Sequence, residues 1–171
     1  MLCEADIKVS WRARPRGFVA LMSLYESNYL RFLHLAGDPT RLSGTLISRI
    51  DGDCELHLAV LEHMPYTSTL ALTYVLPSGD SERFERLPDL KLLAYHDARL
   101  LEADQLRPPP RQQSPHQQPP HQSGQPTGKG HNARRQDALK GERELHQRWT
   151  RNMMLNKWLE YCVERGHRFT I

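Results

Sequence analysis

Hydrophobic residues recur at every third or fourth position in two long stretches of the chain, one in each half. The first stretch extends from Phe18 to Ala36, and its apolar side chains would form a single stripe along a helix. Gly37, followed by Asp38-Pro39, is typical of a helix end. The sequence therefore predicts an amphipathic helix over 18–36, with Glu26 and Asn28 beside the apolar stripe.

The second stretch extends from Ala138 to Arg165 and ends at Gly166. Because glycine is a poor helix former, Gly141 is expected to interrupt this helix, and its regular part is expected to begin near Glu142. One face carries residues at helical spacing, with Trp158 at its margin: Leu145, Trp149, Asn152 or Met153, Asn156, Leu159, and Cys162 or Val163. Such a helix requires a partner surface for its apolar face.

Between these stretches the pattern changes to alternation, which predicts β-strands. Thr67 to Leu76 is the clearest case, with Leu70, Leu72 and Tyr74 on one face and threonines on the other. This pattern predicts an antiparallel sheet with one packed face and one open or lightly covered face. The other predicted strands are Gly44–Asp51 and Cys54–Glu62, joined by a turn at Asp51-Gly52-Asp53, and Leu90–Tyr95 and Ala98–Ala103, as two strands or as one strand bent at His96-Asp97.

A tract rich in Pro, Gln and His, from 106 to about 135, has almost no apolar side chains and is expected to be a disordered linker. Its proline run could bind an aromatic groove, but a plain linker is favoured, and its histidines lack the scaffold of a metal site. We divide the chain into a flexible basic arm (1–17), a helix plus antiparallel sheet (18–104), the disordered linker (105–137) and a C-terminal helix of the same domain (138–171).

These elements predict an α+β fold, in which an antiparallel sheet of about four or five strands is covered on one face by the two amphipathic helices. The formal net charge of +3 is mild, so it permits nucleic-acid contact through the arginine-rich segments without arguing for it. Three widely spaced cysteines fit a reducing compartment. No stretch has the apolar length of a membrane span or the pattern of a signal peptide. We expect a cytoplasmic protein without a membrane partner.

No catalytic, phosphate-binding or cofactor motif is present, so no cofactor and no metal are expected and any catalytic residue is unknown. In Tyr95-His96-Asp97, His96 could act as a general base with Asp97. Adjacent strand residues face opposite ways, however, which favours a turn where Asp97 caps backbone amides and His96 packs. Thr67, Thr69 and Thr73, next to Tyr66 and Tyr74, could line a ligand pocket, although threonine also suits any half-exposed strand.

Asn152 and Asn156 lie one turn apart in the last helix, where asparagine is unfavourable. A structural role, in which they bond to backbone at a strand end or join the helices to the Tyr95–Asp97 turn, is favoured over ligand binding. Cys162 is expected to be a buried inert thiol rather than half of a dyad with His167. The spacing of Cys54, His57, Cys162 and His167 does not support a zinc site.

Several blocks together resemble one family. They are Leu24-Tyr25-Glu26-Ser27-Asn28-Tyr29-Leu30, Tyr66-Thr67-Ser68-Thr69-Leu70, Leu72-Thr73-Tyr74, Tyr95-His96-Asp97-Ala98-Arg99, Arg148-Trp149 and the stretch from Asn152 to His167. The chain resembles the YqiB-like bacterial proteins, a family of unknown function (DUF1249), over about 20–104 and 140–169. The resemblance implies a small cytosolic protein and no known activity, and the Pro/Gln/His tract departs from the family pattern.

Three functions are compatible with these features. The first is a non-enzymatic binding or adaptor module for an unknown protein or small-molecule partner. The second is a small hydrolase or proton-transfer enzyme that uses His96 with Glu26 or Asp97, and the third is a weak nucleic-acid binder. The binding module is favoured, with a candidate polar-aromatic surface of Glu26, Asn28, Tyr66, Thr67, Tyr95, His96, Asp97, Trp149, Asn152 and Trp158.

Overall fold

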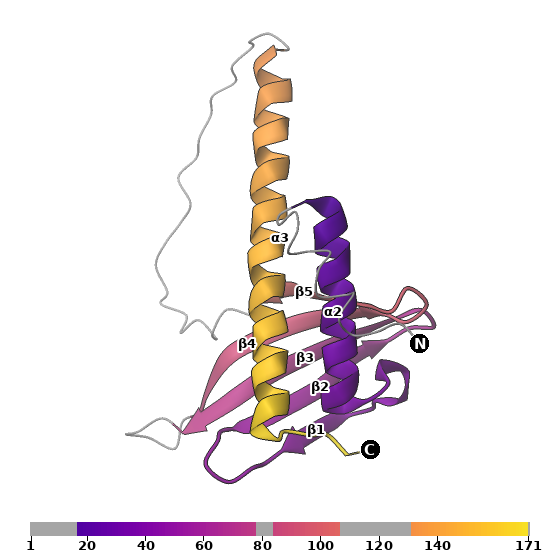
Figure 1. The fold of residues 1–171 in the computed structure, drawn as a ribbon, viewed down its shortest axis with the longest axis vertical. Coiled ribbons are helices and arrows are strands. Elements are labelled where there is room, and N and C mark those ends of the chain that lie inside the picture. Colours follow the sequence, from indigo (N-terminus) through magenta and orange to yellow (C-terminus); the bar gives the residue numbers. More distant parts are fainter. Residues whose placement is uncertain (1–16, 78–83, 107–130, 171) are drawn as a thin grey trace, which may run out of the picture.

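The fold is shown by a computed structural model that describes residues 17–77, 84–106 and 131–170 (Figure 1). Within these ranges the side chains of 77, 84–85, 105–106 and 131–138 are not described. The basic arm and most of the Pro/Gln/His tract, with the arginines of the nucleic-acid hypothesis, therefore lie outside the described residues.

Both helices expected from the periodicity are present. Helix α2 comprises Phe18–Ala36, as predicted, and ends at Gly37, whose φ of 74° is in the left-handed region that favours glycine. Helix α3 comprises His131–Arg165. It begins seven residues earlier than predicted and passes through Gly141 without a break, so the expected interruption was wrong. One glycine costs a helix only about 1 kcal/mol, which the rest of a long helix can offset.

Five strands form one antiparallel sheet in the order β1-β2-β3-β4-β5. Their bounds are Thr45–Ser48 for β1, Glu55–His63 for β2, Thr67–Pro77 for β3, Phe84–Tyr95 for β4 and Leu100–Leu106 for β5. Strand β1 is shorter than predicted. Strand β4 begins six residues before the predicted Leu90, because the charged residues and Pro88 at its start hide the alternation. Two separate strands, β4 and β5, lie before and after His96-Asp97. This is the first of the two alternatives that the sequence left open.

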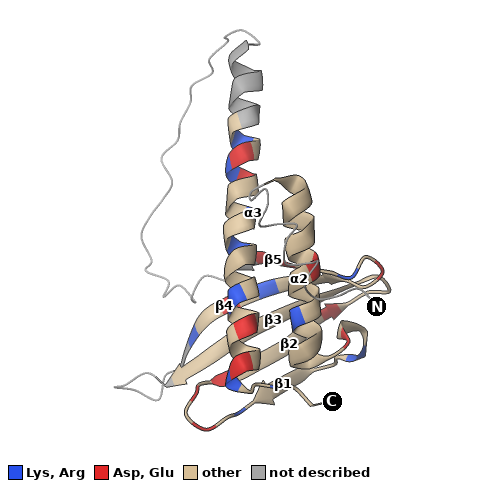
Figure 2. Ribbon diagram, in the orientation of Figure 1, with Lys and Arg blue, Asp and Glu red and all other residues tan. Residues whose placement is uncertain are grey.

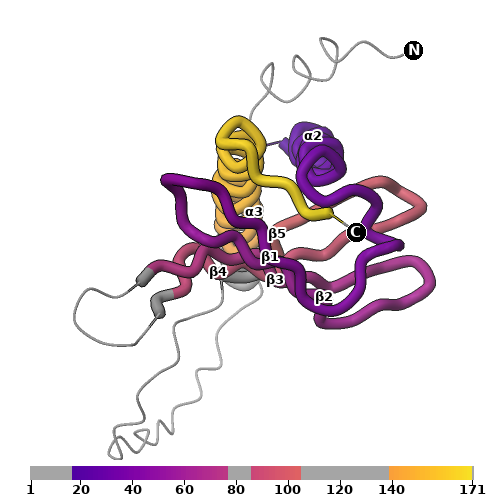
Figure 3. The backbone as a smooth tube through the Cα atoms, turned by 90° about the horizontal axis from the view of Figure 1, so that it is seen from below, coloured from indigo at the N-terminus to yellow at the C-terminus, as the bar shows by residue number. Residues whose placement is uncertain are grey.

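Helices α2 and α3 lie side by side on one face of the sheet, as seen from below in Figure 3. The core between the helices and the sheet is built from the alternating leucines of the strands, including Leu58, Leu72 and Leu92, with Phe32 of α2 and Leu159 of α3. The α+β fold class is therefore confirmed. Among the described residues, no helix is long and apolar enough to span a membrane.

The two helices run in the same direction (Figure 1). The N-terminal part of α3 extends past the N-terminal end of α2. Beneath them, the edge strand β5 contacts both helices. Three small polar side chains, one from α2 and two from α3, meet where the two helices contact β5. The candidate functional site is built around these side chains.

Candidate functional site

Asn28 of α2 and Asn152 and Asn156 of α3 are fully buried and bond to one another. The Asn28 amide nitrogen donates to Asn152 Oδ1 at 3.2 Å, and the Asn156 amide nitrogen donates to Asn28 Oδ1 at 3.0 Å. The Asn156 nitrogen also donates to Ser27 Oγ at 3.0 Å. The three asparagines thus bond across the two helices, although Asn156 Oδ1 is buried without a hydrogen-bond partner among the described residues.

The same amides close the outer edge of β5. Asn152 Oδ1 accepts the backbone N–H of Ala103 at 2.8 Å, and Asn28 donates to the carbonyl oxygen of Leu101 at 3.3 Å. An edge strand leaves such groups unpaired, and a buried unpaired group is costly. The asparagines therefore bond to strand backbone, as in the structural role predicted for them. The strand is β5, and the Tyr95–Asp97 turn is not their partner.

Glu102 is buried on β5 and was not identified from the sequence. The Tyr95 hydroxyl donates to Glu102 Oε1 at 2.8 Å, and Arg148 of α3 lies 3.8 Å from Oε2. Burial, and then the bond to Glu102, raise the pKa of Tyr95 to about 12. The Tyr25 hydroxyl is buried nearby without a well-formed hydrogen bond, and burial raises its pKa far above the usual range. An inward-facing charge of this kind also protects a sheet edge from pairing.

His96 bonds to Ser68, not to either predicted carboxylate. The buried Ser68 hydroxyl lies 2.9 Å from His96 Nε2 and 2.8 Å from His63 Nδ1. Because a hydroxyl has one proton, it can donate to only one of these imidazoles and must accept from the other. The backbone N–H of His96 donates to the Tyr66 carbonyl at 2.9 Å, which joins the turn after β4 to the turn before β3.

The predicted pairing of His96 with Glu26 or Asp97 does not form. Asp97 Oδ1 accepts the backbone N–H of Ala98 at 2.8 Å, which is the capping role favoured from the sequence. Glu26 is exposed on α2, and the structure places no hydrogen bond or ion pair between these two described residues and His96. The specific geometry on which the enzyme hypothesis depended is therefore missing.

A second buried cluster holds the C-terminal segment. His167 is fully buried, with Nδ1 3.0 Å from the Ser48 hydroxyl and Nε2 3.6 Å from Asp53 Oδ2. Burial lowers the pKa of His167. Ser48, His167 and Asp53 follow one another as the nucleophile, base and orienting acid of a catalytic triad would. Ser48 is buried, however, and its oxygen also accepts the Arg168 N–H at 3.2 Å. The arrangement therefore anchors the segment instead of presenting a nucleophile.

Cys162 and Trp158 lie in the core beside this cluster. The Cys162 thiol is 3.5 Å from the Tyr74 hydroxyl, and burial raises its pKa to about 11, so it is a buried thiol as expected. Trp158 packs edge-on against Tyr74, with ring centroids 5.4 Å apart. Within 17–77, 84–106 and 139–170, no group of three or more His, Cys, Asp or Glu side chains is arranged to hold a metal ion.

The ten residues of the predicted surface thus divide among different environments instead of converging. Asn28 and Asn152 bond inside the helix pair, while Trp149 and Trp158 are buried in the two parts of the core. Tyr66 and Asp97 are exposed and Thr67 is half-buried, at the same end of the sheet as His96, while Tyr95 bonds to Glu102. The sequence did not reveal the contact of Ser68 with His96, because these residues are 28 positions apart, and it gave no signal for the bond between His63 and Ser68.

The fold and these clusters define an α+β protein with a helix pair fastened to one edge of an antiparallel sheet. The chain belongs to the family described as protein of unknown function (DUF1249), whose model matches residues 31–134. No curated protein and no solved structure matches the chain. The matched range includes all five strands of the sheet and the Ser68–His96 contact, whereas Asn28, Asn152 and Asn156 lie outside it.

Proposed function

We propose that the protein is a binding module that contacts a protein partner through one end of its sheet. We name this the turn-end surface and define it by Leu61, His63, Met64, Tyr66 and His96. It combines Tyr66 and His96 of the predicted polar-aromatic surface with Leu61 and His63 of β2 and with Met64, which follows β2.

The exposure of three large apolar side chains within six residues carries this proposal. Tyr66 is 70% exposed, Met64 is 50% exposed and Leu61 is 49% exposed. Scattered apolar residues are normal on a surface, but a local group beside polar residues is typical of a protein-binding site. Tyrosine and methionine are also enriched in interfaces.

Rigid support of the same residues adds to the argument. The backbone N–H of Met64 donates to Thr67 at 2.8 Å, which closes the β2–β3 turn, and Ser68 joins His63 to His96 beneath it. A surface held in one conformation before binding loses less entropy when a partner docks. These polar contacts, two of them made by the buried Ser68 hydroxyl, therefore hold the exposed side chains in a fixed arrangement.

The test is affinity capture with the full chain, comparing the M64S/Y66S double variant with the wild type. Leu87→Ser is the matched control, since Leu87 is 54% exposed on β4 near the opposite end of the sheet. We expect a partner that the wild type and the control retain equally and that the double variant loses by about tenfold or more. Equal retention by all three proteins, or none above blank resin, would refute the proposal.

A further inference from the structure

The first half of α3 projects from the body of the protein (Figure 1). Every side chain from Leu139 to Arg148 is exposed except the half-buried Leu145, and the next residue, Trp149, is buried against α2. A helix that is polar nearly all round is seldom stable without a partner or many internal charge pairs. This segment therefore has a surface available for another molecule.

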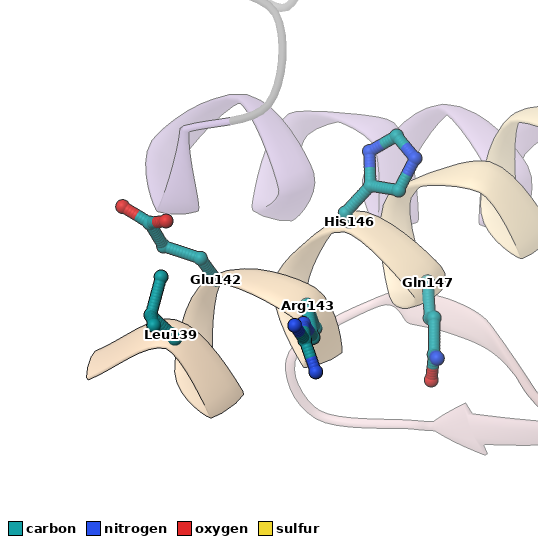
Figure 4. Close-up of a pocket in the computed structure, with 5 residues that line it drawn as sticks. All are labelled: Leu139, Glu142, Arg143, His146 and Gln147. Carbon is teal, nitrogen blue, oxygen red and sulfur yellow. The ribbon is translucent and has the colours of Figure 1, made fainter. Parts of the chain in front are cut away.

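A shallow pocket lies on this segment, lined by Leu139, Glu142, Arg143, His146 and Gln147. Figure 4 shows Glu142 and His146 on one rim and Arg143 and Gln147 on the other. Leu139, 47% exposed, supplies apolar surface at one end. Acidic and basic residues occupy neighbouring turns here (Figure 2), and the pocket lining itself contains one of each, Glu142 and Arg143.

This surface is complementary to itself. When two identical helices pack antiparallel about a two-fold axis, each rim faces the same rim of the other copy. Glu142 then faces His146 of the second copy, and His146 faces its Glu142, which gives two equivalent carboxylate–imidazole contacts. Arg143 likewise faces Gln147. A pocket lined by one acidic and one basic residue fits such a copy better than it fits a polyanion, which needs an excess of positive charge.

We propose that two copies of the chain associate through this segment of α3, packed antiparallel across the Glu142–His146 rim. The association is independent of the turn-end surface, which lies at one end of the sheet. It is concentration-dependent, because one helix face with a single exposed leucine is small compared with a permanent interface.

Sedimentation of the full chain over a concentration series tests this proposal. The wild type should change reversibly from monomer to dimer. H146E should weaken the dimer about tenfold or more, because it places Glu142 opposite a second carboxylate, twice per dimer. The exchanged variant E142H/H146E restores the acid–imidazole contact with the two residues reversed, and its dimer should return to within about threefold of the wild type.

Tyr161→Ser is the control, since Tyr161 is 45% exposed on α3 outside the pocket and should leave the dimer unchanged. All substituted side chains are exposed, so far-UV circular dichroism should show intact folding. The proposal is overturned if the wild type stays monomeric at its highest soluble concentration. It is also overturned if H146E dimerises like the wild type, or if the exchanged variant remains as weak as H146E.

Discussion

Asn152 is expected to be the residue whose loss most directly separates the helix pair from the sheet. Its side-chain oxygen accepts from Ala103 N at 2.8 Å and from Asn28 at 3.2 Å, and its nitrogen donates to the Arg148 carbonyl at 2.9 Å. In Asn152→Ala, the Ala103 N–H remains buried without an acceptor. Asn28 keeps its second acceptor, the Leu101 carbonyl oxygen.

The orphaned Ala103 donor costs about 1–3 kcal/mol. Truncation of a buried side chain adds roughly 1 kcal/mol for the space left behind. We therefore expect the free energy of unfolding to fall by about 2–4 kcal/mol, a large share of the roughly 5–15 kcal/mol typical of a domain. Urea unfolding at 25 °C, followed by tryptophan fluorescence and by circular dichroism, measures this change.

Thr150→Ala is the matched control, because Thr150 is exposed on the same helix and its hydroxyl bonds only to the local His146 carbonyl among the described contacts. It should change stability by about 0.5 kcal/mol or less. The double variant N28A/N152A should be destabilised by less than the sum of the single variants, because both single changes remove the same bond. An N152A protein as stable as T150A, or strict additivity in the cycle, would show that the asparagine cluster does not hold the helices to β5.

Two further predictions concern buried titratable groups. Burial lowers the pKa of His167, so the folded state disfavours its protonation; the free energy of unfolding should decrease as pH falls below the unfolded-state value of about 6.5. Urea unfolding at pH 7.5 and 5.5 should show a smaller decrease for H167Q than for the wild type, and an equal decrease would remove His167 as the cause. The Cys162 thiol, with a pKa raised to about 11, should react with a thiol reagent at pH 8 much more slowly than Cys54 in the folded C3S variant and at a similar rate in urea. Rapid modification of Cys162 in the folded protein would contradict its burial.

The elements of the fold could be predicted where one periodicity extends over many residues. The stripe from Leu21 to Phe32 and the alternation from Leu70 to Tyr74 both have this property, and the structure confirms α2 and β3 there. Prediction failed where local signals conflict with tertiary packing. Gly141 does not interrupt α3, and Pro88 does not prevent β4 from starting at Phe84.

The candidate site was harder to predict, because hydrogen bonds connect residues that are distant in the chain. The unusual position of Asn152 in a helix was visible in the sequence, and so was a structural role for it. Its acceptor and donor groups on Ala103 are 49 residues away and belong to the backbone, so no side-chain pattern could identify them. The sequence favoured a capping role for Asp97, which the structure shows, but it offered only Glu26 and Asp97 as candidate partners of His96, whereas the side chain that bonds to His96 is Ser68.

The sequence by itself determined which faces are apolar, where the turns fall, and therefore that two helices cover an antiparallel sheet. These properties follow from local geometry, since a helix repeats every 3.6 residues and a strand every two. Tertiary structure alone decided what each polar residue bonds to. Glu102 meets Tyr95 and Arg148, and His167 meets Ser48, because a buried polar group is costly without a partner and the packed chain brings these residues together.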